Sequence, residues 1–229
     1  MPFELVWLWA IIPAAAAIVV AQDELRRVRR RALLARWAAA RGLGYRARDD
    51  APAGTPFPYF LSGQKRRAIN VISGPLAGDR ILIFDYRHEE DLGEAMVGRR
   101  RGERERTCVV LPSGLAGRQV DIARRRPFDE LTGAGSFIDI EPPNPSLALR
   151  WRVRASDPRF AAALLDEDVC AFIEAAPDVR FETAGGSLAV IAPRTEAADL
   201  EALLELARAL RARLPARVRA SYGAPAAGA

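Results

Sequence analysis

The chain has 229 residues, half of them hydrophobic, which suits one globular domain or two small lobes and excludes a disordered protein. Its net charge of +5 comes from residues 22–48, which carry nine arginines against two carboxylates, whereas residues 49–229 are almost neutral. Because the positive charge is confined to this one segment, it argues against a nucleic-acid partner. Cys108 and Cys170 are too few for a disulfide scaffold and fit a reducing compartment.

The first predicted element is an uncharged apolar run of seventeen positions at 5–21. As a helix this run would be about 26 Å long, close to the ~30 Å hydrocarbon core of a bilayer. Trp7 and Trp9 would lie at one membrane interface, where aromatic side chains gather. We therefore predict a transmembrane helix over 1–22. Two alternatives stay open: a cleaved signal peptide, although no Lys or Arg precedes the run, and a buried core helix, although the segment is apolar on all sides.

Residues 23–42 predict a basic juxtamembrane helix that continues the first one and ends near Gly42. The positive-inside rule places this arginine-rich side in the cytoplasm. The expected location is therefore the inner cell membrane, with the N-terminus outside and the C-terminal domain cytoplasmic. The expected partners are the lipid bilayer and its anionic headgroups. Five arginines of this helix would contact those headgroups: Arg26, Arg27, Arg29, Arg30 and Arg31. The alternative is a solvated face that only determines topology.

Residues 43–140 predict an antiparallel β-rich lobe, built as a meander. Prolines at 52, 56 and 58 exclude a helix or a central strand from the connection at 51–60, and Phe57, Tyr59 and Phe60 would fix this connection to the core. Residues 67–73 and 79–86 predict a hairpin, with a Gly-Pro turn signal after the first strand. The predicted strands of this lobe are 43–50, 67–73, 79–86, 106–112 and 118–123. A short helix is expected after Pro127.

A proline-rich linker at 141–146 leads to a second predicted lobe at 147–217. The apolar alternation of 147–156 predicts a strand, and 157–176 predicts a helix. Residues 179–192 predict a hairpin with two glycines at its tip, and 196–215 predict an amphipathic helix. This order is a βαββα lobe, and 218–229 would be a flexible tail. The predicted fold class is α+β.

Several stretches of the chain, PFPYF, NVISG, IFDY and CVVLP, precede this strand–helix–hairpin–helix order of 147–215. Together they resemble a group of uncharacterised bacterial membrane-anchored proteins that carry a domain of unknown function. The resemblance covers most of the chain. It implies a membrane helix, a basic juxtamembrane helix and a following domain, and it implies no catalytic residues.

The sequence FDYRHEE at 84–90 contains the only histidine, His88, beside Asp85 and Tyr86. Nucleotide-binding, zinc-protease and hydrolase motifs are missing from the sequence. Any nucleophile–histidine pair must therefore use His88. If 80–88 pairs antiparallel with 105–111, Cys108 lies opposite Phe84 and His88 lies opposite Arg104, so the two candidate side chains are about 13 Å apart. That separation is beyond hydrogen-bond reach.

The carboxylates that follow His88 could ligate a metal ion, but their mixture with arginines favours a solvated loop that includes His88. We therefore expect no catalytic residue, no metal and no cofactor. The sequence favours a non-enzymatic, single-pass membrane protein with a cytoplasmic interaction or scaffold domain, and a second protein is an allowed partner. The alternative is a membrane-associated enzyme or metal-binding domain that uses Asp85, Tyr86, His88 and nearby carboxylates. A secreted domain after signal cleavage is the third interpretation.

Overall fold

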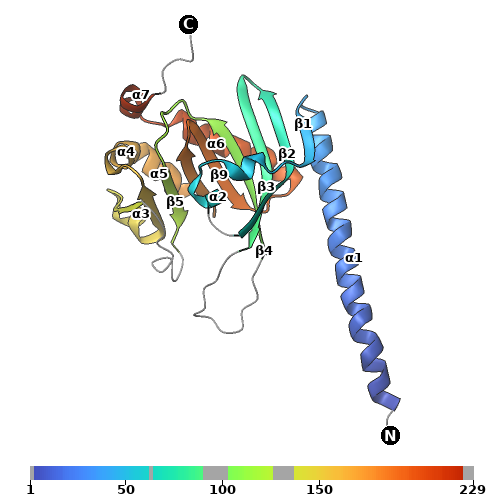
Figure 1. Cartoon of the computed structure of the whole chain (residues 1–229). Helices are drawn as coiled ribbons and strands as arrows, with labels where there is room; N and C mark the ends of the chain where they lie inside the picture. The colour runs from blue at the N-terminus through green and yellow to red at the C-terminus, as the bar shows by residue number, and fades with distance from the viewer. Residues whose placement is uncertain (1–2, 62–63, 90–102, 126–136, 224–229) are drawn as a thin grey trace.

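The computed structural model describes residues 3–61, 64–89, 103–125 and 137–223, with side chains from residue 15 onward. A long helix leads into a domain built on one large sheet (Figure 1). The elements in chain order are α1 (Phe3–Ala39), β1 (Gly44–Arg48), η1 (Ala51–Gly54), α2 (Pro58–Leu61), β2 (Gln64–Leu76), β3 (Asp79–Glu89), β4 (Glu103–Pro112), β5 (Val120–Arg124), β6 (Ile138–Ile140), α3 (Pro145–Arg150), β7 (Trp151–Ala155), α4 (Pro158–Leu164), α5 (Glu167–Ala175), β8 (Arg180–Ala184), β9 (Ser187–Pro193), η3 (Ala197–Asp199), α6 (Leu200–Ala212) and α7 (Ala216–Tyr222).

The nine strands form a single antiparallel sheet in the order β1-β2-β3-β4-β9-β8-β5-β7-β6. The predicted α+β class with an antiparallel sheet is confirmed. The division into separate lobes at 43–140 and 147–217 is not, because β9 pairs with β4 and carries the sheet across the 141–146 connection. The predicted meander stops at β4, since β5 pairs with β7 and β8 instead. Five consecutive buried residues in β9, 188–192, show that both faces of the sheet are covered at this strand.

Two hairpins and one register agree with the sequence predictions. β2 and β3 form the first hairpin, and β8 and β9 form the second, with Gly185 and Gly186 at its tip in the left-handed region. In the β3–β4 pair, Cys108 lies opposite Phe84 and His88 lies opposite Arg104, as the antiparallel pairing of 80–88 with 105–111 predicted.

Four local predictions were wrong. Two of them failed because a single capping residue starts a helix that the sequence pattern did not reveal. Residues 147–156 are not one strand, because Asn144 caps the short helix α3 through Ser146 N and the strand begins only at β7. The single helix expected at 157–176 is two helices, because Asp166 accepts from Val169 N and starts α5. The connection at 51–60 holds the helical turns η1 and α2. The expected tail at 218–229 includes most of α7, and the helix expected after Pro127 lies outside the described residues.

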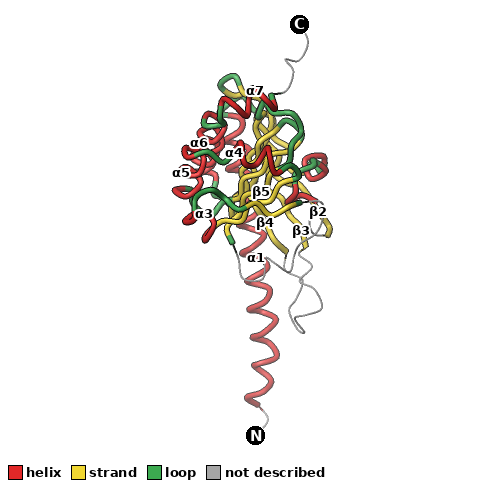
Figure 2. Tube along the Cα trace, turned by 90° about the vertical axis from the view of Figure 1, so that its left-hand side faces the viewer, coloured by secondary structure: helices red, strands yellow, loops and turns green. Residues whose placement is uncertain are grey.

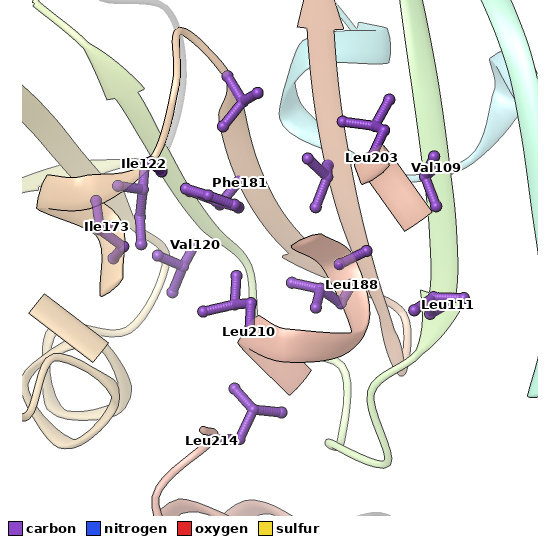
Figure 3. Close-up of a cluster of buried hydrophobic side chains, with 14 of the residues drawn as sticks. Val109, Leu111, Val120, Ile122, Ile173, Phe181, Leu188, Leu203, Leu210 and Leu214 are labelled. Carbon is purple, nitrogen blue, oxygen red and sulfur yellow. The ribbon is translucent and has the colours of Figure 1, made fainter. Parts of the chain in front are cut away.

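Two layers cover the sheet. On one face α4, α5, α6 and the end of α1 pack on the sheet and bury the larger core (Figure 2). Figure 3 shows part of this core, where Leu203 and Leu210 of α6 lie over Val109, Leu188 and Phe181 of the sheet. The segment 51–61 covers the opposite face, with Phe57 and Phe60 fully buried as predicted.

Helix α1 extends away from the domain, and only its C-terminal part packs on it (Figures 1 and 2). Its 37 residues correspond to a length of about 55 Å. Leu34 and Ala38 are buried against the sheet, whereas Ile18, Val19 and Val20 are more than half exposed. Within the described part of the chain, no helix meets the length and hydropathy that a membrane crossing requires. The transmembrane helix at 1–22 therefore stays a prediction.

Candidate functional site

Strand β3 separates the three residues that the sequence placed in one candidate site. Successive side chains of a strand point to opposite faces of its sheet. Asp85 points to the face that carries α1, where it bonds Arg30. Tyr86 belongs to the aromatic cluster on the other face, and His88 stacks on it. A catalytic or metal site that uses all three side chains is therefore not assembled.

Arg30 of α1 and Asp85 of β3 form a buried ion pair, with 3% and 1% of the residues exposed. Arg30 Nε and Nη2 donate to the two carboxylate oxygens at 2.9 and 2.7 Å. This bidentate arrangement is the strongest geometry for an arginine–carboxylate pair. Further hydrogen bonds surround the pair: Arg30 Nη1 donates to Thr195 O at 2.6 Å, while Asn70 Nδ2 and Thr107 Oγ1 donate to Asp85 at 2.7 and 2.9 Å.

The environment of Arg30 keeps it charged despite its burial. Desolvation, the largest influence, lowers the pKa of the guanidinium, but the hydrogen bond and charge of Asp85 outweigh it and the pKa is raised overall. The prediction that Arg30 contacts lipid headgroups is wrong, because the domain encloses its side chain. Of the other four arginines, Arg26, Arg29 and Arg31 are exposed, and Arg27 is half-buried beside Asp23 at 2.8 Å. The side chains of Trp7 and Trp9 lie outside the described residues.

A groove of about 450 Å³ lies beside the Arg30–Asp85 pair, between α1 and the connection from β9 to α6. We call it the arginine groove. Its lining combines four guanidinium groups with one apolar and one acidic side chain: Arg26, Arg29, Arg30, Leu33, Arg194 and Glu196. Arg194 was not among the sequence candidates. It follows a strand about 150 residues beyond the basic segment, and no sequence signal connects the two.

On the opposite face, His88 is buried, with 3% of the residue exposed. The sequence prediction that His88 lies in a solvated loop is therefore wrong. Its ring stacks on Tyr86 at 5.1 Å between centroids, and Tyr59 meets it edge-on at 5.2 Å. Tyr86 Oη donates to Phe60 O at 3.2 Å, and burial raises the pKa of the Tyr86 hydroxyl. The covering segment 51–61 supplies Tyr59 and Phe60, so a distant loop shields a histidine whose sequence neighbours are charged.

A pair of buried carboxylates, Asp121 and Glu182, lies directly opposite each other on β5 and β8. Arg154 Nε and Arg180 Nε approach Asp121 at 3.0 and 2.8 Å, which compensates its charge. The single N–H of Tyr59 is shared between the two carboxylate oxygens of Glu182, at 3.1 Å from each. Burial and the negative charge of Asp121 raise the pKa of Glu182 to about 8. The sequence analysis missed this pair; its only signal is an acidic residue inside each of two short strands.

The described residues contain no group of three or more histidine, cysteine or acidic side chains placed to hold a metal ion. Cys108 is fully buried, and desolvation raises the pKa of its thiol well above the usual range, which disfavours the reactive thiolate. The buried polar groups within these ranges pair mostly with one another. That arrangement is typical of structural networks.

Comparisons with known proteins identify a shared fold. No protein-family model matches the chain, and no curated protein matches it either. Among solved structures, the crystal structure of the mycobacterial trehalose monomycolate transport factor A, TtfA, is similar to it. The TM-score is 0.59 at 18% sequence identity, and the alignment covers 86% of this chain and 97% of that one. This chain therefore shares the overall fold of that structure.

Proposed function

We propose that the protein is a non-catalytic scaffold, held at the inner membrane by a single helix, with its domain in the cytoplasm. The shared fold with transport factor A supports a role of this kind, because that protein's name describes a factor in transport. The proposal extends this kind of role to the present chain without extending the cargo. The family resemblance of the short sequence stretches points to the same architecture.

The exposed apolar surface of α1 is the observation that carries the proposal. Ile18, Val19 and Val20 are 57%, 63% and 68% exposed, and they are consecutive, so they cover the helix on several sides. An exposed apolar surface of this kind needs a membrane or a partner to cover it. The apolar sequence continues toward the N-terminus through residue 5. A bilayer would cover all sides of this helix, whereas one docked protein partner would cover only one side.

The charge of α1 supports the proposed orientation. Arg26, Arg29 and Arg31 are exposed on the domain side of the apolar run, and Glu4 precedes it. A domain on the arginine-rich side is cytoplasmic under the positive-inside rule. The separation of Asp85 from Tyr86 and His88 supports the non-catalytic part of the proposal.

A topology and fractionation experiment tests the proposal. The full chain is fused at its C-terminus to a reporter that is fluorescent only in the cytoplasm, and membranes are washed with alkaline carbonate. We expect fluorescence and retention in the washed pellet, while a control that lacks residues 1–22 enters the soluble fraction. A mature protein that begins at Gln22 in the culture medium, or an external C-terminus, contradicts the proposal.

A further inference from the structure

We propose that the arginine groove is a binding site for a phosphate group that carries a net negative charge, as in the headgroup of an anionic phospholipid. This inference rests on the proposed membrane attachment of α1. It differs from a diffuse basic collar because it selects three accessible arginines, Arg26, Arg29 and Arg194, that two separate parts of the chain bring together.

The groove has guanidinium groups available for a ligand. Arg26 and Arg29 are exposed, and no carboxylate within the described ranges forms an ion pair with either. Arg194 lies 3.5 Å from Glu105, a carboxylate that Arg87 also approaches at 2.8 Å. With Arg30 paired to Asp85, the lining of the groove holds three further arginines against one carboxylate, Glu196, so positive charge is in excess there. The planar guanidinium fork matches the oxygens of a phosphate, so arginine is the side chain suited to this ligand.

The network around Arg30 fixes both walls of the groove. Arg30 Nη1 bonds Thr195 O at 2.6 Å, and Thr195 N donates to Thr107 Oγ1 at 2.9 Å. These bonds hold the connection that carries Arg194 at a constant position beside α1. A ligand then finds its donors already in place, which reduces the entropic cost of binding.

The depth of the groove favours a lipid as the source of the phosphate. If the hydrocarbon core ends near Ala21, Arg26 lies about 7.5 Å and Arg29 about 12 Å farther along the helix axis. The headgroup layer of one leaflet is about 5–7 Å thick. Side chains of a helix tilt toward its N-terminus, which here is the membrane side. Both Cα atoms therefore lie beyond the headgroup layer, and the two side chains reach back toward the headgroup phosphates.

Glu196 opposes the ligand at the rim of the groove. It is 69% exposed in its side chain, and its Oε2 lies 3.9 Å from Arg30 Nη1. A bound anion would be repelled by this carboxylate. Removing its charge with Glu196→Gln should therefore tighten phosphate binding, and a diffuse collar predicts only a small change.

Native mass spectrometry of the full chain, released from detergent micelles, measures the binding. Separate samples contain micelles with phosphatidylglycerol, micelles with phosphatidylcholine, or inorganic phosphate in the buffer. We expect one phosphatidylglycerol to be retained, and the triple variant R26Q/R29Q/R194Q to weaken it by about tenfold or more, because each arginine adds to the attraction. The matched control R27Q/R31Q/R36Q removes the same charge outside the groove and should retain the lipid. Unchanged thermal unfolding of both triple variants shows that the domain stays folded.

The possible results separate the two sources of phosphate and the two proposals. Retention of inorganic phosphate at millimolar concentration, without retention of either lipid, would keep the phosphate site and assign it to a soluble ligand. Equal losses in both triple variants, or equal retention of phosphatidylcholine, would overturn the site in favour of a diffuse collar. Fractionation of the groove variant keeps the proposals distinct, since a failed groove leaves the protein in the membrane pellet, whereas a failed membrane attachment does not.

Discussion

Replacing Arg30 by Met should destabilise the domain more than the same replacement at any exposed arginine of α1. The substitution removes two hydrogen bonds to Asp85, one to Thr195 O and one to Thr107 Oγ1, and it leaves a buried carboxylate without its cation. Asn70 and Thr107 still donate to this carboxylate, but neither carries a positive charge. Breaking a buried pair from one side costs about 3–5 kcal/mol in the free energy of unfolding. That is a large share of the ~5–15 kcal/mol typical of a domain.

The double variant R30M/D85N separates the lost pair from the stranded charge. Asparagine has the shape of aspartate and its oxygen still accepts from Asn70 or Thr107, so the double variant should recover about half of the loss. The assay is urea unfolding of the full chain in detergent micelles, followed by tryptophan fluorescence, because Trp151 is fully buried. R31M is the exposed control and should cost less than about 0.5 kcal/mol. A cost below about 1 kcal/mol for R30M, or strict additivity in the double variant, would refute the reasoning.

Three further predictions concern other parts of the domain. Glu182 has a folded-state pKa of about 8, above its unfolded value near 4.3. Its contribution to the free energy of unfolding is therefore fully present below the unfolded pKa and is lost as pH rises through about 8. The free energy of unfolding should therefore fall between about pH 5 and pH 8, and E182Q should flatten this slope in urea titrations; an unchanged slope contradicts the assignment. Leu147 is fully buried and Leu149 is 80% exposed, so L147A should cost about 2–5 kcal/mol and L149A almost nothing, whereas the single strand expected from the sequence would bury both. Cys108 and Cys170 are buried with raised thiol pKa values, so neither should react with a thiol reagent at pH 8 until urea unfolds the chain, and rapid labelling of the folded protein would show the burial to be wrong.

Local patterns predicted most elements of the fold. The apolar run of β3 identified one strand of the first hairpin, and the β3–β4 register followed from simple pairing. The Gly-Pro signal was misplaced, because Gly74 and Pro75 lie inside β2 and the turn is at residues 77–78. The order of strands in the sheet could not be obtained in the same way. The apolar residues of β4 and β5 mark each as a strand but do not specify its neighbour, and only the tertiary structure inserts β9 and β8 between them.

The candidate site shows a stronger limit of sequence reasoning. Arg29, Arg30 and Arg31 are identical in sequence terms, yet one is buried and two are exposed, because helix phase and the position of β3 select which side chain meets Asp85. His88 was assigned to solvent from its charged neighbours. It is buried because Tyr59, almost thirty residues earlier, covers it. Both outcomes depend on contacts between distant segments, which a single sequence does not contain.

The unbroken course of α1 into the domain limits how the domain can move. A flexible tether would let a membrane-bound domain rotate and sample a hemisphere of positions. Here the helix continues without a break to Ala39, and Arg30 is bonded inside the domain. If α1 is held in a bilayer, the sheet stands at one height and one tilt above the surface. Partners in the same membrane would then meet the same face each time, with little orientational search before contact.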